Sequence, residues 1–523
     1  MPADHYDVIV IGSGPGGAAL VQRLAPTGKR ILLLERGDYL PRSLANWDPK
    51  AVFVDGIYQA LETWYDKDGA PFHPGLHYFV GGNSKMYGAA LFRLRERDFE
   101  EVEHSDGISP AWPLKYADFE PYYTQAEQLF HVHGQRGEDP TEPPASGPYP
   151  YPAVSHEPRL EALHQHFAEQ GTRPFHMPLG ILLDEAHGKV LPTSTCIRCG
   201  AFDGYPCMVN GKADAQVICV DPTLAAYPNV TLLTNAFATR LDTDPAGRTI
   251  TAVQVERADV HETYSADIVV SACGALSSAL LLLRSANPQH PNGLANGSGQ
   301  LGRNYMRHNQ SVLLALSAER NDTVFQKTLA LSDFYFGDDQ FPHPMGLIQM
   351  TGKSHAATLK GEALPHWLEW LPDLPFDEIS RHALDFWLSS EDLPRPENRI
   401  RIDSDGRVVL EQYDNNLEAH HQLKRKLEQL VRETGAHPHL IERELNLGKA
   451  IPLGGTAHQA GTARFGTDPA TSVLDLNCKA HELDNLYLAD ASFFVSIGAV
   501  NPTLTIVANA LRMADHIKQR LGA

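Results

Sequence analysis

The hydrophobic pattern at the start of the chain predicts a strand, a turn, a helix and a second strand. Tyr6 to Ile11 is an apolar-rich run without alternation, which is typical of a parallel strand buried on both faces. The glycine-rich turn Gly12 to Gly17 follows at once, and Ala18 to Leu24 continues as a helix. The run Arg30 to Leu34 then predicts the second strand, which ends at Glu35.

A second unit of the same kind lies in the middle of the chain. Asp267 to Ala272 is another predicted buried strand, and it runs through Cys273-Gly274 into a helix over Leu276 to Ser285. Before it, Val230 to Leu241 and Ile250 to Glu256 are predicted as strands joined by a turn. These elements favour a Rossmann-like α/β domain.

The pattern changes to alternating apolar and polar positions between about Val312 and Lys449, which predicts an antiparallel sheet. The alternating segments are Val312 to Leu316, Leu347 to Met350, Leu384 to Leu388 and Arg399 to Ile402. Periodic apolar positions predict helices over residues 118–130, with Asp118 as the N-cap, 160–170, 420–434 and 503–519. The charged helix 420–434 is expected to present a solvated face, and segment 136–152 is a proline-rich loop or linker.

The acidic composition narrows the classes of partner. The 523 residues include 44 basic and 64 acidic ones, which gives a net charge of −20. Nucleic acids and anionic membranes attract basic faces, so neither is an expected partner, and neutral small molecules are the expected substrates. Asp4 and Asp7 stand where an export signal would be positive, and no apolar window approaches a membrane span of about 18 to 20 residues. We therefore expect a cytoplasmic protein.

Four of the six cysteines gather in one stretch and allow three interpretations. Cys196 and Cys199 form a C-x2-C pair, and Cys207 and Cys219 follow at a C-x11-C spacing. A zinc site, a redox disulfide and buried free thiols are all compatible with this stretch. The second spacing departs from that of a zinc knuckle, so free thiols are favoured and no metal is expected.

The first glycine-rich turn suits a dinucleotide. Gly12, Gly14 and Gly17 permit a tight turn and the close approach of a pyrophosphate to a helix N-terminus, and Glu35 is placed to bind ribose hydroxyls. An ordinary glycine turn is the alternative. The position at the start of a long chain favours FAD over NAD. A further glycine loop, Val80 to Gly88, suits the close approach of a flat ring, although a plain turn would have the same composition.

The C-terminal part of the chain carries the candidate catalytic groups. His458 is a candidate general base because a neutral imidazole has a pKa near the working pH. Asp490 closes an apolar run, and Asn501-Pro502-Thr503 leads into the last predicted helix. This arrangement predicts a ligand at a helix N-terminus, where the positive end of the helix stabilises negative charge. A structural histidine and a helix-capping asparagine are the alternatives.

Together these motifs resemble the glucose–methanol–choline (GMC) family of flavin-dependent alcohol oxidoreductases. The similar segments run nearly from end to end and are Gly12 to Gly17 with Glu35, Gly81 to Ser84, Trp112-Pro113, Ala272 to Leu283, Leu301 to His308, His458 to Gly466 and Asp490 to Ile506. The pyranose-oxidase-like branch, which includes bacterial glycoside oxidases, looks most similar. The hints for this branch are Ser390 to Arg399, His458-x-x-Gly461-Thr462 and Gly498-Ala-Val-Asn501.

The resemblance implies an FAD-binding domain of residues 1–110, 190–310 and 450–523, and a substrate-binding domain of residues 111–189 and 311–449. His458 falls on the catalytic histidine of the family, and Asn501 falls on its partner. Some members attach FAD through a histidine of the second glycine loop, where this chain has Met86, so non-covalent FAD is expected. The expected cofactor-binding residues are Gly12, Gly14, Gly17, Glu35, Arg36, Gly82, Asn83, Ser84, Met86, Ala236, Phe237, Cys273, Gly274, Asp490, Asn501, Pro502 and Thr503.

By the same resemblance, the expected reaction is oxidation of a secondary ring hydroxyl, at C2 or C3 of a sugar or glycoside, to a ketone. His458 would take the hydroxyl proton while Asn501 aims the C–H bond at flavin N5, and O2 or a quinone would accept the electrons. The alternatives are oxidation of a sterol, choline-like or aryl alcohol, a non-redox lyase and a non-catalytic flavin-binding protein. Segment 355–379, with Trp367 and Trp370, is either a lid or a surface insertion.

Overall fold

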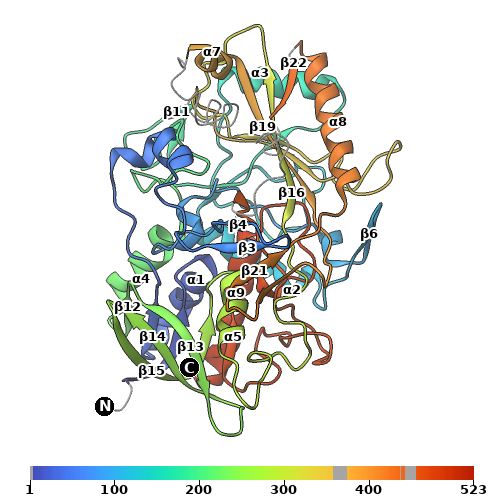
Figure 1. Cartoon of the computed structure of the whole chain (residues 1–523). Coiled ribbons are helices and arrows are strands. Elements are labelled where there is room, and N and C mark those ends of the chain that lie inside the picture. Colours follow the sequence, from blue (N-terminus) through green and yellow to red (C-terminus); the bar gives the residue numbers. More distant parts are fainter. Residues whose placement is uncertain (1–3, 357–373, 436, 442–454) are drawn as a thin grey trace.

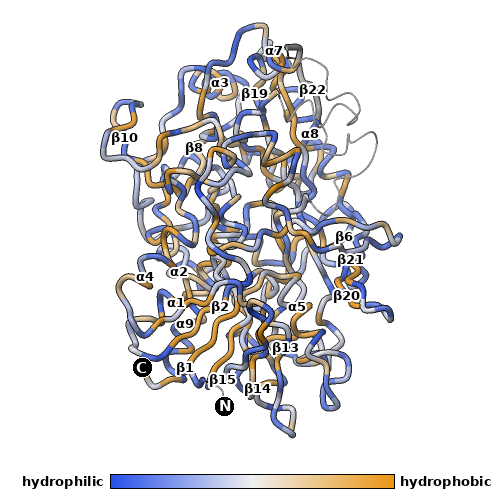
Figure 2. The backbone as a smooth tube through the Cα atoms, turned by 60° about the vertical axis from the view of Figure 1, so that its left-hand side comes forward, coloured by the Kyte–Doolittle hydropathy of each residue, from blue (hydrophilic) through white to orange (hydrophobic). Residues whose placement is uncertain are grey.

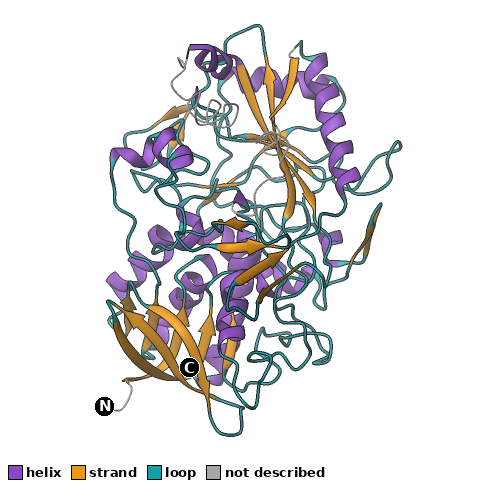
Figure 3. Ribbon diagram, in the orientation of Figure 1, coloured by secondary structure: helices purple, strands orange, loops and turns teal. Residues whose placement is uncertain are grey.

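The molecule is elongated and carries one large sheet in each half. The computed structural model describes residues 4–356, 374–435, 437–441 and 455–523. Figure 1 shows one sheet in the lower half and a second sheet in the upper half, and Figure 3 shows helices lying against both. The N-terminal strand and the C-terminal helix both belong to the lower half. The predicted fold class, an α/β domain combined with an antiparallel sheet, is confirmed.

The first sheet contains the predicted Rossmann-like strands. Among the described residues its order is β12-β2-β1-β15-β14-β13, and β23 pairs with β15. The strands span Asp4–Ile11 (β1), Ile31–Leu34 (β2), Val230–Leu233 (β12), Phe237–Thr243 (β13), Ile250–Arg257 (β14), Val260–Ser271 (β15) and Leu486–Leu488 (β23). β1 pairs in parallel with β2 and β15, and Figure 2 shows these three as neighbouring hydrophobic strands. Val8, Ile9 and Val10 have no exposed surface, which explains why the run does not alternate.

The helices of this half begin where parallel strands end. α1 (Pro15–Leu24) follows β1 through Gly14, and α5 (Ala275–Arg284) follows β15 through Gly274. Because β1 and β15 are parallel neighbours, both helix N-termini lie at the carboxyl ends of these strands, on the same side of the sheet. α9 (Thr503–Arg520) packs against α1, and α4 (Asp221–Ala226) leads into β12.

The predicted strand over Val230 to Leu241 is wrong as a single element. The structure divides it into β12, at one edge of the sheet, and β13, in the antiparallel part at the other edge. Asn235 lies between them with a φ of 54°, which turns the chain out of the sheet. Its N–H donates to the Gly37 carbonyl (2.9 Å), and the Ala236 N–H donates to the Glu35 carbonyl (2.8 Å).

The second sheet is antiparallel, as predicted, and helices cover one of its faces. Within the described residues its order is β22-β16-β19-β18-β17-β8. The strands span Phe175–His176 (β8), His308–Leu316 (β16), Leu329–Leu331 (β17), Leu347–Met350 (β18), Ala383–Glu391 (β19) and His437–Ile441 (β22). Leu313, Phe386 and Ile348 pack in one apolar cluster with residues of α3 (Pro158–Glu169) and α8 (Leu417–Glu433).

Three further details differ from the predictions. Segment Arg399–Ile402 is a strand, β20, but it belongs to a small separate sheet with β21 (Val408–Glu411), β3 (Trp64–Asp66) and β4 (Pro71–Phe72). Helix α8 begins earlier than expected and is only partly solvated, because Leu423, Leu427 and Val431 are buried against the sheet. Asp118 is not the N-cap of α2 (Tyr116–Leu129), since its Oδ2 accepts the N–H of the cap residue Lys115 (2.8 Å).

The remaining elements are short. They are the strand pairs β5 (Val102–His104) with β6 (Gly107–Ser109), β7 (Val132–His133) with β9 (Leu179–Gly180), and β10 (Glu185–Ala186) with β11 (Lys189–Val190), and helix α7 (Leu374–His382). Trp367 and Trp370 lie outside the described residues. Among the residues that are described, no helix is long and apolar enough to cross a membrane, and the cytoplasmic location stays a prediction.

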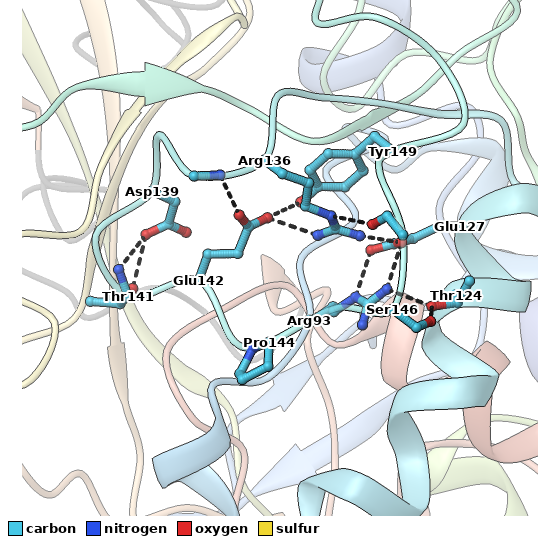
Figure 4. A network of polar contacts seen from close by, with 12 residues as sticks. Arg93, Thr124, Glu127, Arg136, Asp139, Thr141, Glu142, Pro144, Ser146 and Tyr149 are labelled. Carbon is cyan, nitrogen blue, oxygen red and sulfur yellow. Dashed lines mark hydrogen bonds and ion pairs between the residues drawn. The ribbon is translucent and has the colours of Figure 1, made fainter.

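The proline-rich segment after α2 is a packed loop that buried ion pairs hold in place. Figure 4 shows this network. Both oxygens of Glu127, on α2, accept hydrogen bonds from the Arg93 guanidinium, each 2.7 Å long. Arg136 donates to Glu127 (2.5 Å) and to Glu142 (2.7 Å), and its guanidinium lies 3.6 Å from the centre of the Tyr149 ring. These contacts join the segment to both the N-terminal part of the chain and α2.

Candidate active site

A cavity of about 830 Å³ reaches from the first sheet to the second. At one end it is lined by the glycine turns that follow β1 and β15. At the other end it is lined by Val312, Trp387 and Gln349, which pair across β16, β19 and β18 and therefore share one face of the second sheet. The cavity thus offers one continuous space to an elongated ligand and a second, smaller molecule.

The first-sheet end of the cavity presents backbone rather than side chains. A Cβ atom built on Gly14 or Gly274 would meet nothing within 4 Å, so both glycines border open space at the N-termini of α1 and α5. Gly274 also has a φ of 89°, which L side chains rarely adopt. Two helix N-termini with bare backbone before them form a cradle for the phosphates of a dinucleotide. The residues present therefore fit FAD.

The second glycine loop lies directly against the first. A Cβ atom on Gly82 would come within 3.0 Å of the Gly14 Cα. The Gly81 N–H donates to Ser13 Oγ (3.0 Å), and Ser13 Oγ donates to the Glu35 carboxylate (2.6 Å). The two loops therefore form one wall of the cavity, and β2 braces it through Glu35.

Two buried acids at this end accept hydrogen bonds from backbone N–H groups. Glu35 accepts from Ser13 and Gly37, both at 3.0 Å, and Asp490 accepts from Gly274 at 3.0 Å. Burial raises the pKa of both carboxyl groups. A carboxylate has lone pairs for about four hydrogen bonds, so each acid can also accept one from a ligand hydroxyl.

Nearly all the predicted site residues line this cavity. Those that do are Gly12, Gly14, Glu35, Arg36, Gly82, Asn83, Ser84, Met86, Ala236, Phe237, Cys273, Gly274, His458, Asp490, Asn501, Pro502 and Thr503. Gly17 is the exception, because it packs against the turn behind the wall, where a Cβ would lie 2.1 Å from the Gly12 carbonyl oxygen. Asn83 and Ser84 shape their own loop: Asn83 Oδ1 accepts from the His77 N–H (2.9 Å), and Ser84 Oγ donates to the Gly81 carbonyl (2.6 Å).

The second-sheet end of the cavity holds the candidate base. His458 Nδ1 lies 2.7 Å from Nδ1 of His308 and 3.0 Å from Nε2 of Gln310. His308 and Gln310 are two positions apart on β16 and therefore on one face of the strand. Nε2 of His308 is 3.0 Å from the Gly498 carbonyl oxygen. His458 is thereby fixed between the second sheet and the segment that leads to Asn501.

The surroundings of His458 keep it uncharged. Burial lowers the pKa of His458 well below its usual value, and the neighbouring His308 and Lys327 act in the same direction. Burial also lowers the pKa of His308 to about 4. Both imidazoles are therefore neutral at pH 7 and able to accept a proton. Lys327 is itself paired with the Asp203 carboxylate, which also accepts from Thr351 Oγ (3.0 Å).

Asn501 lies in the same cavity, immediately before α9. Its Oδ1 accepts a hydrogen bond from Gln349 Nε2 (3.3 Å), and Gln349 on β18 is only 2% exposed. This bond crosses from the first-sheet half to the second sheet. Because α9 begins at Thr503, its positive end lies at this point of the cavity.

Sequence reasoning missed the polar residues behind the candidate pair. His308 and Gln310 contact His458, and Gln349 contacts Asn501. Lys327 and Trp387 line the cavity. No role was predicted for any of these five residues. The available signal was the alternation in β16, which places His308, Gln310 and Val312 on one face. A pair of polar residues on an otherwise apolar strand indicates a buried site, but the sequence does not show which residues this pair contacts.

The cysteine-rich stretch carries free thiols. All six cysteines lie in the described residues and none is in a disulfide, and burial raises the pKa of Cys196 to about 12. In the described part of the chain, no group of three or more His, Cys, Asp or Glu side chains is arranged to hold a metal ion. Gly200, Asp203 and Tyr205, which lie between Cys199 and Cys207, line the cavity, so this stretch serves as part of its wall.

Comparison with known proteins places these features in one family of enzymes. The chain is 30% identical to 6‴-hydroxyparomomycin C oxidase of Streptomyces lividus, over 99% of this chain and 92% of that protein. It is also 30% identical to paromamine 6′-oxidase of Streptomyces fradiae, over 98% and 91% of the two chains. A pyranose 2-oxidase of Tricholoma matsutake is 43% identical, but over only 65 residues, so the expected branch stays a prediction.

Solved structures and family models agree with this placement. The fold is similar to that of formate oxidase from Aspergillus oryzae, with a TM-score of 0.67 at 16% identity and 99% coverage of both chains. Residues 180–310 and 394–510 match the N-terminal and C-terminal models of the GMC oxidoreductases, a family that binds FAD and acts on CH–OH groups. The chain, with its glycine cradle and its half-buried His458, therefore belongs to the GMC oxidoreductase family and is an oxidoreductase.

Proposed function

We propose that the protein binds FAD non-covalently and oxidises a hydroxyl group of a sugar or glycoside to a carbonyl group. The observation that carries the proposal is that a neutral imidazole and a carboxamide, those of His458 and Asn501, line one cavity that begins at the glycine cradle. The names of the two Streptomyces relatives, oxidases of hydroxyparomomycin C and of paromamine, support a sugar-like substrate.

His458 is the proposed proton acceptor. A neutral imidazole can take the proton of the substrate hydroxyl, and positioned general bases contribute about 10²- to 10⁴-fold to rates. The contacts to His308 and Gln310 hold the ring in one orientation, so little orientation entropy is lost when substrate arrives.

Asn501 is the proposed group that orients the substrate oxygen. Because its Oδ1 accepts from Gln349, the donor group Nδ2 is the part of this side chain that can hold the oxygen. The positive end of α9 lies beside it and stabilises negative charge that develops at this place. When bound, FAD supplies the acceptor for the hydride that leaves the same carbon.

Non-covalent binding is proposed because Met86 stands in the glycine loop at the position where some relatives of the family carry the attached histidine. The thioether of Met86 lines the cavity and is a weak acceptor without a nucleophilic nitrogen. Acid precipitation of the purified holoenzyme should therefore release all of the flavin into the supernatant. A yellow pellet after washing would contradict this part of the proposal.

The main test is anaerobic reduction of the flavin. Free glucose, a methyl glucoside and an aryl glucoside are each added to the holoenzyme without oxygen, with choline, a sterol and benzyl alcohol as comparators. Loss of the yellow colour with a sugar or glycoside is the expected result. Bleaching by the comparators alone would replace the sugar by another alcohol, and no bleaching at all would contradict the proposal.

The finer part of the proposal is the position of the hydroxyl and the electron acceptor. We propose a secondary hydroxyl at C2 or C3, as the resemblance to the pyranose-oxidase-like branch implies, and O2 or a quinone as acceptor. The names of the two relatives give positions 6‴ and 6′ instead. The structure of the oxidised sugar therefore distinguishes between these positions. A ring ketone in the NMR spectrum supports C2 or C3, whereas an aldehyde at C6 contradicts it. Stopped-flow reoxidation with O2 and with a quinone identifies the acceptor.

A further inference from the structure

His308 lies between a backbone carbonyl and the proposed base. Its Nε2 is 3.0 Å from the Gly498 carbonyl oxygen, and its Nδ1 is 2.7 Å from Nδ1 of His458. A carbonyl oxygen only accepts hydrogen bonds, so Nε2 of His308 must carry a hydrogen atom. At 2.7 Å the two Nδ1 atoms must share one hydrogen atom, because two lone pairs at this distance would repel each other.

The state of His308 decides which ring supplies that hydrogen. Burial lowers the pKa of His308 to about 4, although the buried Glu391 carboxylate on β19 raises it. His308 is therefore neutral at pH 7 and carries one ring hydrogen, which is already assigned to Nε2. Its Nδ1 is then an acceptor, and His458 Nδ1 is the donor. A neutral His458 has only this one ring hydrogen, so its Nε2 bears a lone pair.

Gln310 is compatible with this assignment in one orientation of its carboxamide. Its Nε2 contacts the same His458 Nδ1 at 3.0 Å, and an amide N–H would need a lone pair there. A carboxamide can turn by 180° without changing its shape, and it then presents Oε1 as a second acceptor for the Nδ1–H. The opposite choice would require a doubly protonated His308, which the burial of this ring disfavours.

We propose that His308 is a positioning residue that fixes the tautomer of His458, so that Nε2 of His458 is the atom that accepts the substrate proton. The inference rests on the proposed function of His458 as the base. In the step itself, the O–H bond of the substrate breaks and an N–H bond forms at Nε2. His458 becomes an imidazolium, and His308 stabilises it by continuing to accept the Nδ1–H.

The other charged groups near the pair do not replace His308 in this role. Lys327 acts on His458 as a nearby positive charge and disfavours its protonated form. Glu391 lies behind His308 and accepts the Gly498 N–H (3.1 Å), so it braces the same peptide segment whose carbonyl His308 contacts. His458 thus donates to His308, and His308 donates to the Gly498 carbonyl.

The direct test is nitrogen NMR of the holoenzyme labelled with ¹⁵N in its histidines. The signals of the two rings are identified by their loss in the His308→Gln and His458→Ala variants. The inference predicts a hydrogen on Nδ1 and none on Nε2 of His458, and the reverse for His308. A hydrogen on Nε2 of His458 in the wild-type protein at pH 7 would overturn it. This measurement needs no substrate, and the two assignment variants are the only variants that have to fold.

The kinetic test compares two replacements of His308. His308→Gln keeps one donor for Gly498 and one acceptor for His458, whereas His308→Leu keeps neither. Flavin reduction should fall less than about tenfold in His308→Gln and by about 10²-fold or more in His308→Leu, with substrate affinity nearly unchanged, since a base in the wrong tautomer cannot accept the proton. Equal limiting rates in the two variants would contradict the inference, provided that both bind FAD.

The two failures are distinguishable. If no alcohol reduces the wild-type flavin, the proposed function fails, and the tautomer measured by NMR still reports on the geometry. If sugars reduce the flavin but His458 carries its hydrogen on Nε2, the function stands and the role of His308 is wrong.

Discussion

At the scale of single residues, the substrate end of the cavity relies on neutral polar groups. His458 is hydrogen-bonded to Gln310, and Asn501 is hydrogen-bonded to Gln349. The buried Lys327 is balanced by Asp203. A neutral imidazole among neutral amides can accept a proton without first losing one. The same burial that keeps His458 neutral also makes its protonated form costly, which favours return of the proton to solvent after each turnover.

Replacement of the proposed base gives the simplest prediction at this scale. His458→Ala should lower the rate of flavin reduction by at least about 10²-fold, because general-base catalysis typically contributes that much. Stopped-flow measurement under anaerobic conditions checks it. His166→Ala is the matched control, since the His166 side chain on α3 is 56% exposed and His166 is not among the residues that line the cavity. An unchanged rate in His458→Ala would show that another group takes the proton.

The lowered pKa of His458 makes a prediction for pH dependence. The base form persists below the usual histidine pKa of 6.5, so flavin reduction should stay constant from pH 8 to below pH 6 and fall only in more acidic solution. Lys327 contributes to the lowering, so Lys327→Met should raise the pKa and move the acidic fall to higher pH. A fall that stays in place or moves to lower pH in this variant would contradict the assignment of the limb to His458.

The two ends of the cavity were not equally predictable from the sequence. The cofactor end could be predicted because glycine turns and acids at strand ends are local patterns, and the residues from Gly12 to Glu35 lie within two consecutive elements. His458 and Asn501 were candidates from the local pattern, and the resemblance gave them their catalytic roles. His308 and Gln349 could not be predicted in the same way, because their partners are 150 and 152 residues away in the chain and depend on how the sheets meet.

At the scale of elements, buried strands were easier to predict than sheet membership. The run Tyr6–Ile11 is buried on both faces, and its composition alone identifies it. The run 230–241 looks equally uniform, but the left-handed Asn235 divides it between two edges of one sheet. Segment Arg399–Ile402 alternates like its neighbours in sequence, yet it pairs with β21 in another sheet, because pairing partners are not encoded in the period of one strand.

The network around Glu127 gives a stability prediction for α2 and the loop that follows it. Glu127→Gln should lower the free energy of unfolding by about 3 kcal/mol, because it removes the buried negative charge that pairs with both Arg93 and Arg136. Chemical denaturation of both proteins checks the difference. Glu418→Gln is the matched control: Glu418 on α8 pairs with Arg425 at 2.6 Å, but both side chains are more than half exposed. That change should cost less than about 1 kcal/mol, and equal losses in the two variants would contradict the network's role.

At the scale of the whole molecule, the cavity reaches both sheets, so its ligand should stabilise the protein as a unit. Removal of FAD should lower the melting temperature, and added FAD should restore it in a concentration-dependent way. At a hundred times the Kd, bound FAD should add about 2.7 kcal/mol to the free energy of unfolding. Differential scanning fluorimetry of the apoprotein checks this. Riboflavin is the matched ligand, because it lacks the pyrophosphate that the two glycine turns are expected to hold. Equal stabilisation by riboflavin would show that the glycine cradle adds nothing to binding.

The hydrogen bond between Gln349 and Asn501 has a consequence for protein engineering. This bond and the contact of His308 with the Gly498 carbonyl both join the second sheet to the segment that leads into α9. A chimera that takes its second sheet from another family member would inherit that donor's residues at the positions of β16 and β18. If the donor has apolar residues at both positions, the hybrid would keep an intact glycine cradle but reduce its flavin far more slowly until His308 and Gln349 were restored. Grafting new substrate pockets onto this scaffold therefore begins with these two residues as fixed points.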